Sequence, residues 1–226
     1  MAQNALSGSQ GATNFSVGTT DSVFGGGDFC INFKLKYGTN TLNQKYSFFT
    51  TGASVGEGNP QILLGLDVDG VFWIYSGGYA TGTTQLTWTL NQWYDIEVNY
   101  TSGSVKFYVD GVLKETLTKT PTSQAGMWLC GGVVNGSVAG VYDEFRFSNI
   151  QRHTANFTPS EEEFTNDANT LVLWHLNEGT GTSAADSSSN AHTGTVNLGG
   201  STWVAGYTFT AAASGSQKNR IMLGVG

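Results

Sequence analysis

Hydrophobic and polar residues alternate along several short stretches of this chain. In residues 29–37 the apolar side chains share one parity, and they are Phe29, Ile31, Phe33 and Leu35. Residues 93–100 show the clearest alternation, with Tyr94, Ile96, Val98 and Tyr100 separated by Asp95, Glu97 and Asn99. A period of two predicts β-strands with one face in the core and a polar face directed away from it.

Two Asp-Gly pairs separate apolar runs and predict hairpins. Asp69-Gly70 lies within residues 62–76, and Asp110-Gly111 lies within residues 104–117. Asp-Gly readily adopts the positive φ angles of a two-residue type I′ turn, whose twist matches that of the flanking strands.

Short strands account for most of the remaining pattern. Residues 138–148, 171–176, 193–197 and 202–204 favour strands, residues 149–169 are loop with room for one helical turn, and residues 207–226 alternate weakly. The total is about eleven to fourteen strands with turn signals about every 8–12 residues. We therefore expect an all-β fold, a two-sheet antiparallel jelly-roll sandwich.

Composition agrees with strands joined by tight turns. The chain has 226 residues, 31 of them glycine and 3 proline, and 12% are charged. This length suits a single domain over residues 1–226, although two small domains would also fit. Cys30 and Cys130 are the only cysteines, and we expect both to be small core residues without a disulfide bond.

Charge and hydropathy argue against two classes of partner. The formal net charge is −7, and the cations form no basic stripe, so we expect no nucleic-acid partner. No stretch approaches the roughly 18 apolar residues of a membrane span, and residues 1–8 do not resemble a signal peptide. We therefore expect no membrane association.

Five motifs, in order, resemble laminin G-like domains of the concanavalin A-like lectin/glucanase class. They cover about residues 20–160 and lie at residues 27–33, 93–96, 105–111, 142–148 and 152–159. The last motif, RHTANFTP, is especially similar to laminin G-like domains in bacteriophage structural proteins. The resemblance implies a β-sandwich and, for this subtype, a place in a virion.

A sixth motif lies at the opposite end of the chain from its place in that family. Residues 171–195 resemble the segment that opens the family's domain. A circularly permuted sandwich, in which residues 171–210 supply the missing strands, is the favoured interpretation. The alternative is a second, incomplete domain, or a segment that completes a neighbouring subunit of a homo-oligomer.

The sequence lacks the signature motifs of related hydrolases. Retaining glycosidases need two carboxylates about 5–5.5 Å apart, and the Glu-x-Asp-x-Glu signature of related glucanases is absent. Asp95 and Glu97 are read as surface residues. No Gly-x-Ser-x-Gly elbow is found in a strand–turn–helix setting, and the three histidines do not have metal-ligand spacing. We expect no enzymatic activity.

Calcium is the one cofactor that the resemblance suggests, as a structural ion where the first and last strands meet. By this likeness the ligands would be Asp143 and Asp186, with Asn190 nearby. Asp143 also shares parity with Phe145 and Phe147, which predicts a buried carboxylate in need of a cation or of several hydrogen bonds. Capping of backbone amides is the alternative role.

Exposed aromatic residues are the candidates for sugar recognition. Lectin sites combine an aromatic surface with polar groups that fix hydroxyls. Trp73, Tyr75, Tyr79 and Trp88 lie in or near a Gly-rich stretch, and Trp128 lies near another. Each of them could equally be a core residue.

The expected function is that of a non-catalytic virion surface protein, a capsid decoration or a tail or fibre component. Its partners would be viral capsid or tail proteins. Its ligands would include host-surface glycans. It would be located on the exposed surface of the virion. The alternative is a free carbohydrate-binding or adhesion module, which would be extracellular. A glycoside hydrolase is the least favoured class.

Overall fold

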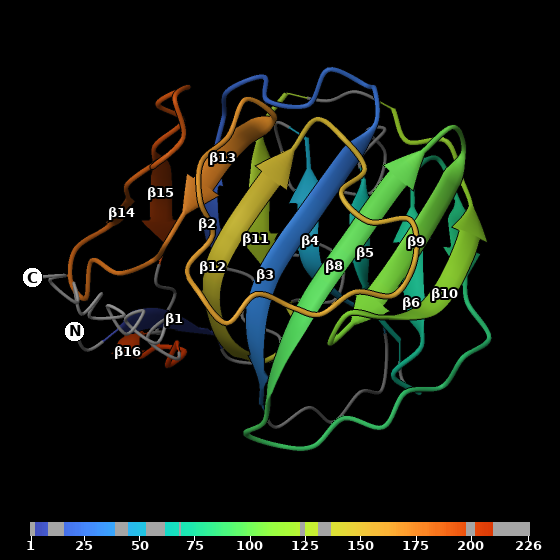
Figure 1. Ribbon diagram of the computed structural model, residues 1–226, viewed down its shortest axis with the longest axis horizontal. Helices are drawn as coiled ribbons and strands as arrows, with labels where there is room; N and C mark the ends of the chain where they lie inside the picture. Colours follow the sequence, from blue (N-terminus) through green and yellow to red (C-terminus); the bar gives the residue numbers. More distant parts are fainter. Residues whose placement is uncertain are drawn as a thin grey trace, which may run out of the picture.

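The chain forms two stacked antiparallel β-sheets. The computed structural model describes residues 3–8, 16–38, 45–52, 62–67, 69–122, 125–130, 137–197 and 202–209. These residues contain sixteen strands and no helix. In Figure 1 one sheet, called sheet A here, faces the viewer, and the other, sheet B, lies behind it. The predicted all-β, two-sheet sandwich is confirmed.

Sheet A contains eight strands. Its spatial order is β10 (Val112–Thr118), β9 (Ser104–Val109), β8 (Trp93–Thr101), β3 (Phe29–Tyr37), β12 (Gly140–Ser148), β1 (Asn4–Gly8) and β16 (Thr202–Ala205). The eighth strand, β13 (Thr170–Trp174), pairs with the second half of β12, while β1 pairs with the first half.

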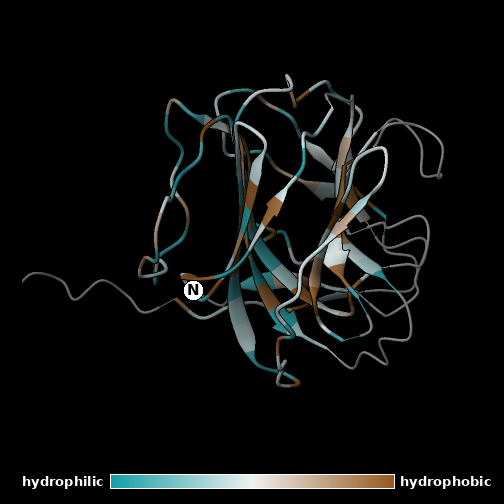
Figure 2. Cartoon of the chain, turned by 90° about the vertical axis from the view of Figure 1, so that its right-hand side faces the viewer, coloured by the Kyte–Doolittle hydropathy of each residue, from teal (hydrophilic) through white to brown (hydrophobic). Residues whose placement is uncertain are grey.

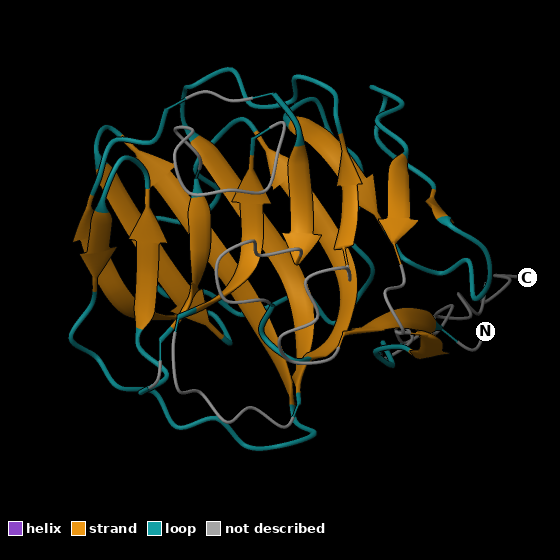
Figure 3. Cartoon of the chain, turned by 180° about the vertical axis from the view of Figure 1, so that it is seen from behind, coloured by secondary structure: helices purple, strands orange, loops and turns teal. Residues whose placement is uncertain are grey.

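Sheet B also contains eight strands and faces the viewer in Figure 3. Its order is β14 (Ser183–Ala184), β15 (Gly194–Asn197), β2 (Ser16–Thr19), β11 (Met127–Cys130), β4 (Tyr46–Thr51), β5 (Leu63–Leu66), β6 (Phe72–Tyr75) and β7 (Tyr79–Thr81). The short edge strands β7 and β14 limit the unpaired backbone that this sheet presents.

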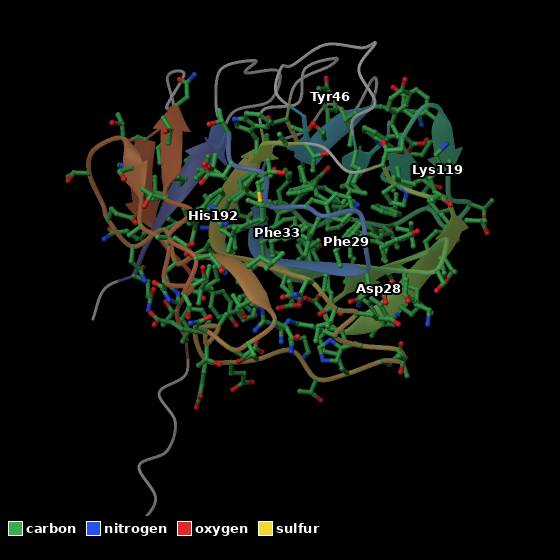
Figure 4. All side chains as sticks on the ribbon, turned by 90° about the horizontal axis from the view of Figure 1, so that it is seen from above. Asp28, Phe29, Phe33, Tyr46, Lys119 and His192 are labelled. Atoms are coloured by element: carbon green, nitrogen blue, oxygen red, sulfur yellow. The ribbon has the colours of Figure 1, made fainter. Side chains whose placement is uncertain are left out.

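A layer of aromatic rings fills the space between the sheets. Phe72 of sheet B stacks on Phe107 of sheet A, with ring centroids 4.3 Å apart and planes 8° apart. Phe33 contacts Phe48, and Phe49 stacks on Phe145. Offset stacked rings add about 0.5–1.5 kcal/mol per pair to their burial. Figure 2 shows the hydrophobic segments on strands of both layers, and Figure 4 shows Phe29 and Phe33 in the interior.

Both predicted hairpins are present, but their turns differ. Asp110 and Gly111 have φ angles of +50° and +71°, as a type I′ turn requires. In the other hairpin only Gly70 has a positive φ. The Gly70 N–H donates to the Asp67 carbonyl oxygen, so this turn begins at Asp67 and is wider than the predicted two-residue turn.

A β-bulge in β12 overturns the predicted orientation of Asp143. The register with β3 shifts between Asp143, opposite Lys34, and Arg146, opposite Asn32. Glu144, with a φ of +51°, is the extra residue. Parity therefore reverses along the strand: Tyr142 and Phe145 face the core, while Asp143 lies on the outer face of sheet A with Lys34.

Residues 149–169 cross that outer face as an irregular segment, visible in front of β3, β8 and β9 in Figure 1. The Phe157 N–H donates to the Gly111 carbonyl oxygen, and the Phe164 N–H donates to Glu144. The predicted helical turn is absent from this segment, while the acidic run of residues 161–163 is exposed as expected. The covering explains why Asp95 and Glu97, predicted as surface residues, are buried.

Residues 170–205 contribute strands to both sheets. β13 pairs with β12 in sheet A, β15 with β2 in sheet B, and β16 with β1. Trp174 is fully buried and stacks on Phe145 at 5.2 Å. Circular permutation relative to the family and exchange between subunits both stay predictions. Of the predicted terminal strand, residues 207–209 are not in a strand and residues 210–226 lie outside the described part of the chain.

We expect a chain truncated after Pro159 to lose its cooperative fold. It would lack β13, β15 and β16 and expose the core partners of Trp174. Each large apolar side chain lost contributes about 1.5–3 kcal/mol, and the whole net stability of a domain is only about 5–15 kcal/mol. Circular dichroism and thermal melting measure this, with truncation after Phe209 as the matched control. A soluble, cooperatively melting chain ending at Pro159 would contradict it.

Candidate functional site

A shallow recess on the outer face of sheet B combines an aromatic ring with hydroxyl and amide groups. The register places Thr195 of β15, Gly18 of β2 and Trp128 of β11 in one row across three strands. Their neighbours Val17, Leu129 and Val196 are core residues. Strand alternation therefore directs Thr195 and Trp128 away from the core.

Two glycines leave the space that the Trp128 indole occupies. A Cβ atom at Gly18 would lie 2.0 Å from Trp128 Cδ1, and one at Gly126 would lie 2.6 Å from Trp128 Cη2. Any larger residue at either position would displace the ring. The indole is half-buried and lies against the sheet, and its Nε1 makes no hydrogen bond within the described part of the chain.

The recess around Trp128, called the Trp128 groove here, has a volume of about 540 Å³. Its lining residues come from β2, β11, β15 and the adjoining loops, and they are Gly18, Thr19, Thr20, Asp21, Trp128, Ala191, Thr193, Thr195 and Asn197. Thr20, Asp21, Thr193, Thr195 and Asn197 are exposed. The groove thus offers one apolar ring face bordered by hydrogen-bonding groups.

Asp21 is the one carboxylate among the described residues that line the Trp128 groove, and hydrogen bonds fix its position. Its carbonyl oxygen accepts hydrogen bonds from the Gly126 and Val23 N–H groups at 2.8 and 3.0 Å. Its Oδ2 lies 2.7 Å from His192 Nδ1. The hydrogen bond with His192 lowers the pKa of the Asp21 carboxyl below its usual value, which keeps it ionised.

The four aromatic residues predicted for sugar binding do not form one site. Trp73, Tyr75 and Tyr79 meet at the β6–β7 corner of sheet B, with ring centroids 5.4 Å apart for Trp73 and Tyr79. Trp73 is only 2% exposed and Tyr79 is 46% exposed, so Tyr79 offers the accessible ring. Trp88 lies elsewhere and stacks on Tyr37 at 5.2 Å.

The residues predicted to bind calcium make other contacts. Asp186 accepts hydrogen bonds from the N–H groups of Leu173, Ser188 and His192, and Asn190 Nδ2 donates to the Thr170 and Leu171 carbonyls. No group of three or more His, Cys, Asp or Glu side chains in the described ranges could hold a metal ion. In these contacts Asp186 and Asn190 brace the backbone of neighbouring segments. Calcium stays a prediction, which native mass spectrometry with and without a chelator tests.

A second recess lies under residues 149–165, on the outer face of sheet A. It has a volume of about 400 Å³ and includes Glu97, Arg146 and His153 in its lining. Both oxygens of Glu97 lie 2.9 Å from His153 Nδ1, and Asn32 and Asn99 donate to the same carboxylate. Asp95 forms an ion pair with Lys34 at 2.7 Å. Internal partners thus occupy the carboxylates of Asp95 and Glu97, while the exposed residues Glu162 and Glu163 also line the recess.

Comparison with known protein families shows which family the chain belongs to. The sequence profile described as the concanavalin A-like lectin/glucanases superfamily, with the short name Laminin_G_3, matches residues 9–156. The chain therefore belongs to the concanavalin A-like lectin/glucanases superfamily. No curated protein sequence matches it.

Solved structures with the same fold share little sequence with this chain. A candidate carbohydrate-binding protein from Bacteroides ovatus is 15% identical with a TM-score of 0.64, covering 93% of this chain and 62% of its own. A heptameric SAP-like pentraxin from Limulus polyphemus is 13% identical with a TM-score of 0.50, covering 67% of this chain and 78% of its own. This chain thus spans less than two thirds of the Bacteroides protein, and both likenesses concern the fold alone.

None of the residues that the structure describes forms a helix of the length and apolarity needed to cross a membrane.

Stability should fall as the pH rises, because of Asp143. Burial raises the pKa of this carboxyl to about 8, and the charges of Glu144 and Glu163 add to the rise. Its pKa in the unfolded chain is near 3.8, so ionisation costs more in the folded state. This loss of free energy of unfolding is absent below pH 4. It grows by up to about 1.4 kcal/mol per pH unit between pH 4 and pH 8 and is complete above pH 8.

The variant Asp143→Asn removes this titration. At pH 5 the substitution should lower the free energy of unfolding by about 1 kcal/mol. The Glu144 and Tyr207 N–H groups donate to the two carboxyl oxygens of Asp143, and Asn has an NH₂ group in place of one of these oxygens. Between pH 5 and pH 9 its free energy of unfolding should decline less than that of the wild type. Parallel denaturation curves for the two proteins would argue against the raised pKa.

Proposed function

We propose that this chain is a non-catalytic glycan-binding module and that the Trp128 groove is its site. The observation that carries the proposal is the indole of Trp128, held against the sheet by Gly18 and Gly126 and bordered by exposed polar side chains. Sugars have one apolar ring face and several hydroxyls. An aromatic face next to Thr, Asn and Asp groups matches both properties.

The chemistry of the groove favours binding over hydrolysis. Asp21 is the one carboxylate among the residues that line it, whereas glycosidases of the retaining and inverting classes need two. The family includes both lectins and glucanases by its name. The single carboxylate among the described lining residues supports a binding role over a catalytic one.

Removing the aromatic platform tests the proposal. Trp128→Ala should weaken binding of an oligosaccharide found on a glycan array by at least about tenfold, because a central aromatic anchor typically contributes 1.4 kcal/mol or more. Trp128→Phe, which retains a ring, should keep part of the affinity. Isothermal titration calorimetry measures both.

Tyr79→Ala is the matched control, since Tyr79 is an exposed aromatic residue of the same sheet at the β6–β7 corner. It should bind like the wild type. Retained binding in Trp128→Ala together with lost binding in Tyr79→Ala would move the site to that corner. Absence of any glycan binding by the wild type would remove the proposed function.

We further propose display of the module on a virion, as a capsid decoration or a tail or fibre component. The support is the resemblance of residues 152–159 to phage laminin G-like domains. In the structure this segment is hydrogen-bonded to strands of sheet A. Lys106 Nζ donates to the Thr154 carbonyl oxygen, and the Leu113 N–H donates to Asn156 Oδ1. Mass spectrometry of purified particles should find the chain, and its consistent absence from them would contradict this role.

A further inference from the structure

The positive charges of the chain lie away from the Trp128 groove. Eight of the ten lysine and arginine residues are described. Five lie on strands of sheet A, Arg152 lies in its covering segment, Lys119 directly follows β10, and Lys45 directly precedes β4. The five on sheet A are Lys34, Lys36, Lys106, Lys114 and Arg146. None of the eight lines the groove. In Figure 4 Lys119 and His192 lie on opposite sides of the molecule.

The undescribed stretches that adjoin the strands of the groove in the sequence contain no cation. Residues 9–15, 123–124, 131–136 and 198–201 precede or follow its strands and contain no lysine or arginine. The two remaining cations, Lys218 and Arg220, belong to the last seventeen residues, 210–226.

The groove instead carries a fixed negative charge. Asp21 is 51% exposed in its side chain, and its carboxylate is hydrogen-bonded by His192 and Thr19. Asp21 lines the groove together with neutral Thr and Asn residues. Even a protonated His192 would only balance Asp21, so the groove does not become positively charged.

We propose that the Trp128 groove selects neutral sugars and discriminates against sialylated, uronic or sulfated ones, with Asp21 as the selecting residue. This inference rests on the proposed glycan-binding function. A bound acidic group would lose hydration and meet a carboxylate with no arginine or lysine to receive it, whereas a neutral sugar can donate a hydroxyl hydrogen bond to Asp21. Repulsion between like charges thus supplies selectivity against anionic ligands.

Paired ligands provide the test. A neutral oligosaccharide and its sialylated and sulfated derivatives are titrated into the wild type by calorimetry at low salt. We expect the acidic derivatives to bind at least about fivefold more weakly, since two charges about 4 Å apart in water repel by about 1 kcal/mol. The difference should narrow at 1 M salt, where the Debye length is about 3 Å.

Variants of Asp21 separate charge from shape. Asp21→Asn should reduce the discrimination, and Asp21→Lys should reverse it in favour of the acidic ligands. Asp28→Asn is the matched control, because Asp28 is also an exposed aspartate that accepts one side-chain hydrogen bond, from Thr101, and it lies far from His192 in Figure 4. It should retain the wild-type ratio of affinities.

The possible failures can be told apart. Equal or stronger binding of the acidic ligands by the wild type, with affinity still lost in Trp128→Ala, would overturn the selectivity and leave glycan binding intact. An Asp21→Lys variant that keeps the wild-type ratio would also overturn it. Binding of no ligand in the panel would instead remove the proposed function itself.

Discussion

The aromatic layer between the two sheets is the constraint on which the rest of this structure depends. The stacking of Phe72 on Phe107 and of Phe49 on Phe145 joins sheet B to sheet A. Once these rings define the inner face of each strand, alternation decides which side chains lie outside. Trp128 is outside because Leu129 is inside, and Thr195 is outside because Val196 is inside. The candidate site is thus a consequence of how the core is filled.

The outer faces of the two sheets differ in how far they are covered. Residues 149–169 cover that of sheet A, which turns a polar face into a buried layer of paired charges such as Lys34 with Asp95. Buried ion pairs tolerate little disturbance, because removing one partner leaves an uncompensated charge. The β2–β11–β15 part of sheet B keeps an accessible recess. The proposed binding site therefore lies on sheet B, and the covered face of sheet A contributes paired charges to the interior.

Periodicity in the sequence was sufficient to predict the strands but not to predict the candidate site. The alternation in residues 93–100 predicted β8 and its core residues, since packing and pattern agree there. Parity failed at Asp143, because a bulge inserts one residue without a sequence signal. Asp21 and Thr193 could not be predicted as neighbours, because pairing of β2 with β15 brings together segments about 170 residues apart. The alternation of Thr195 and Asn197 with Val196 was the one local clue that the sequence offered for β15.

The most direct test of the central claim is the NMR spectrum of the isotopically labelled chain during titration with a neutral oligosaccharide. If the Trp128 groove binds sugar, the indole Nε1–H resonance of Trp128 and the amide resonances of Asp21 and Thr195 should shift together and saturate. Resonances of the β6–β7 corner, including the indole of Trp73, should stay in place. Shifts confined to that corner, or to the covered face of sheet A, would contradict the account.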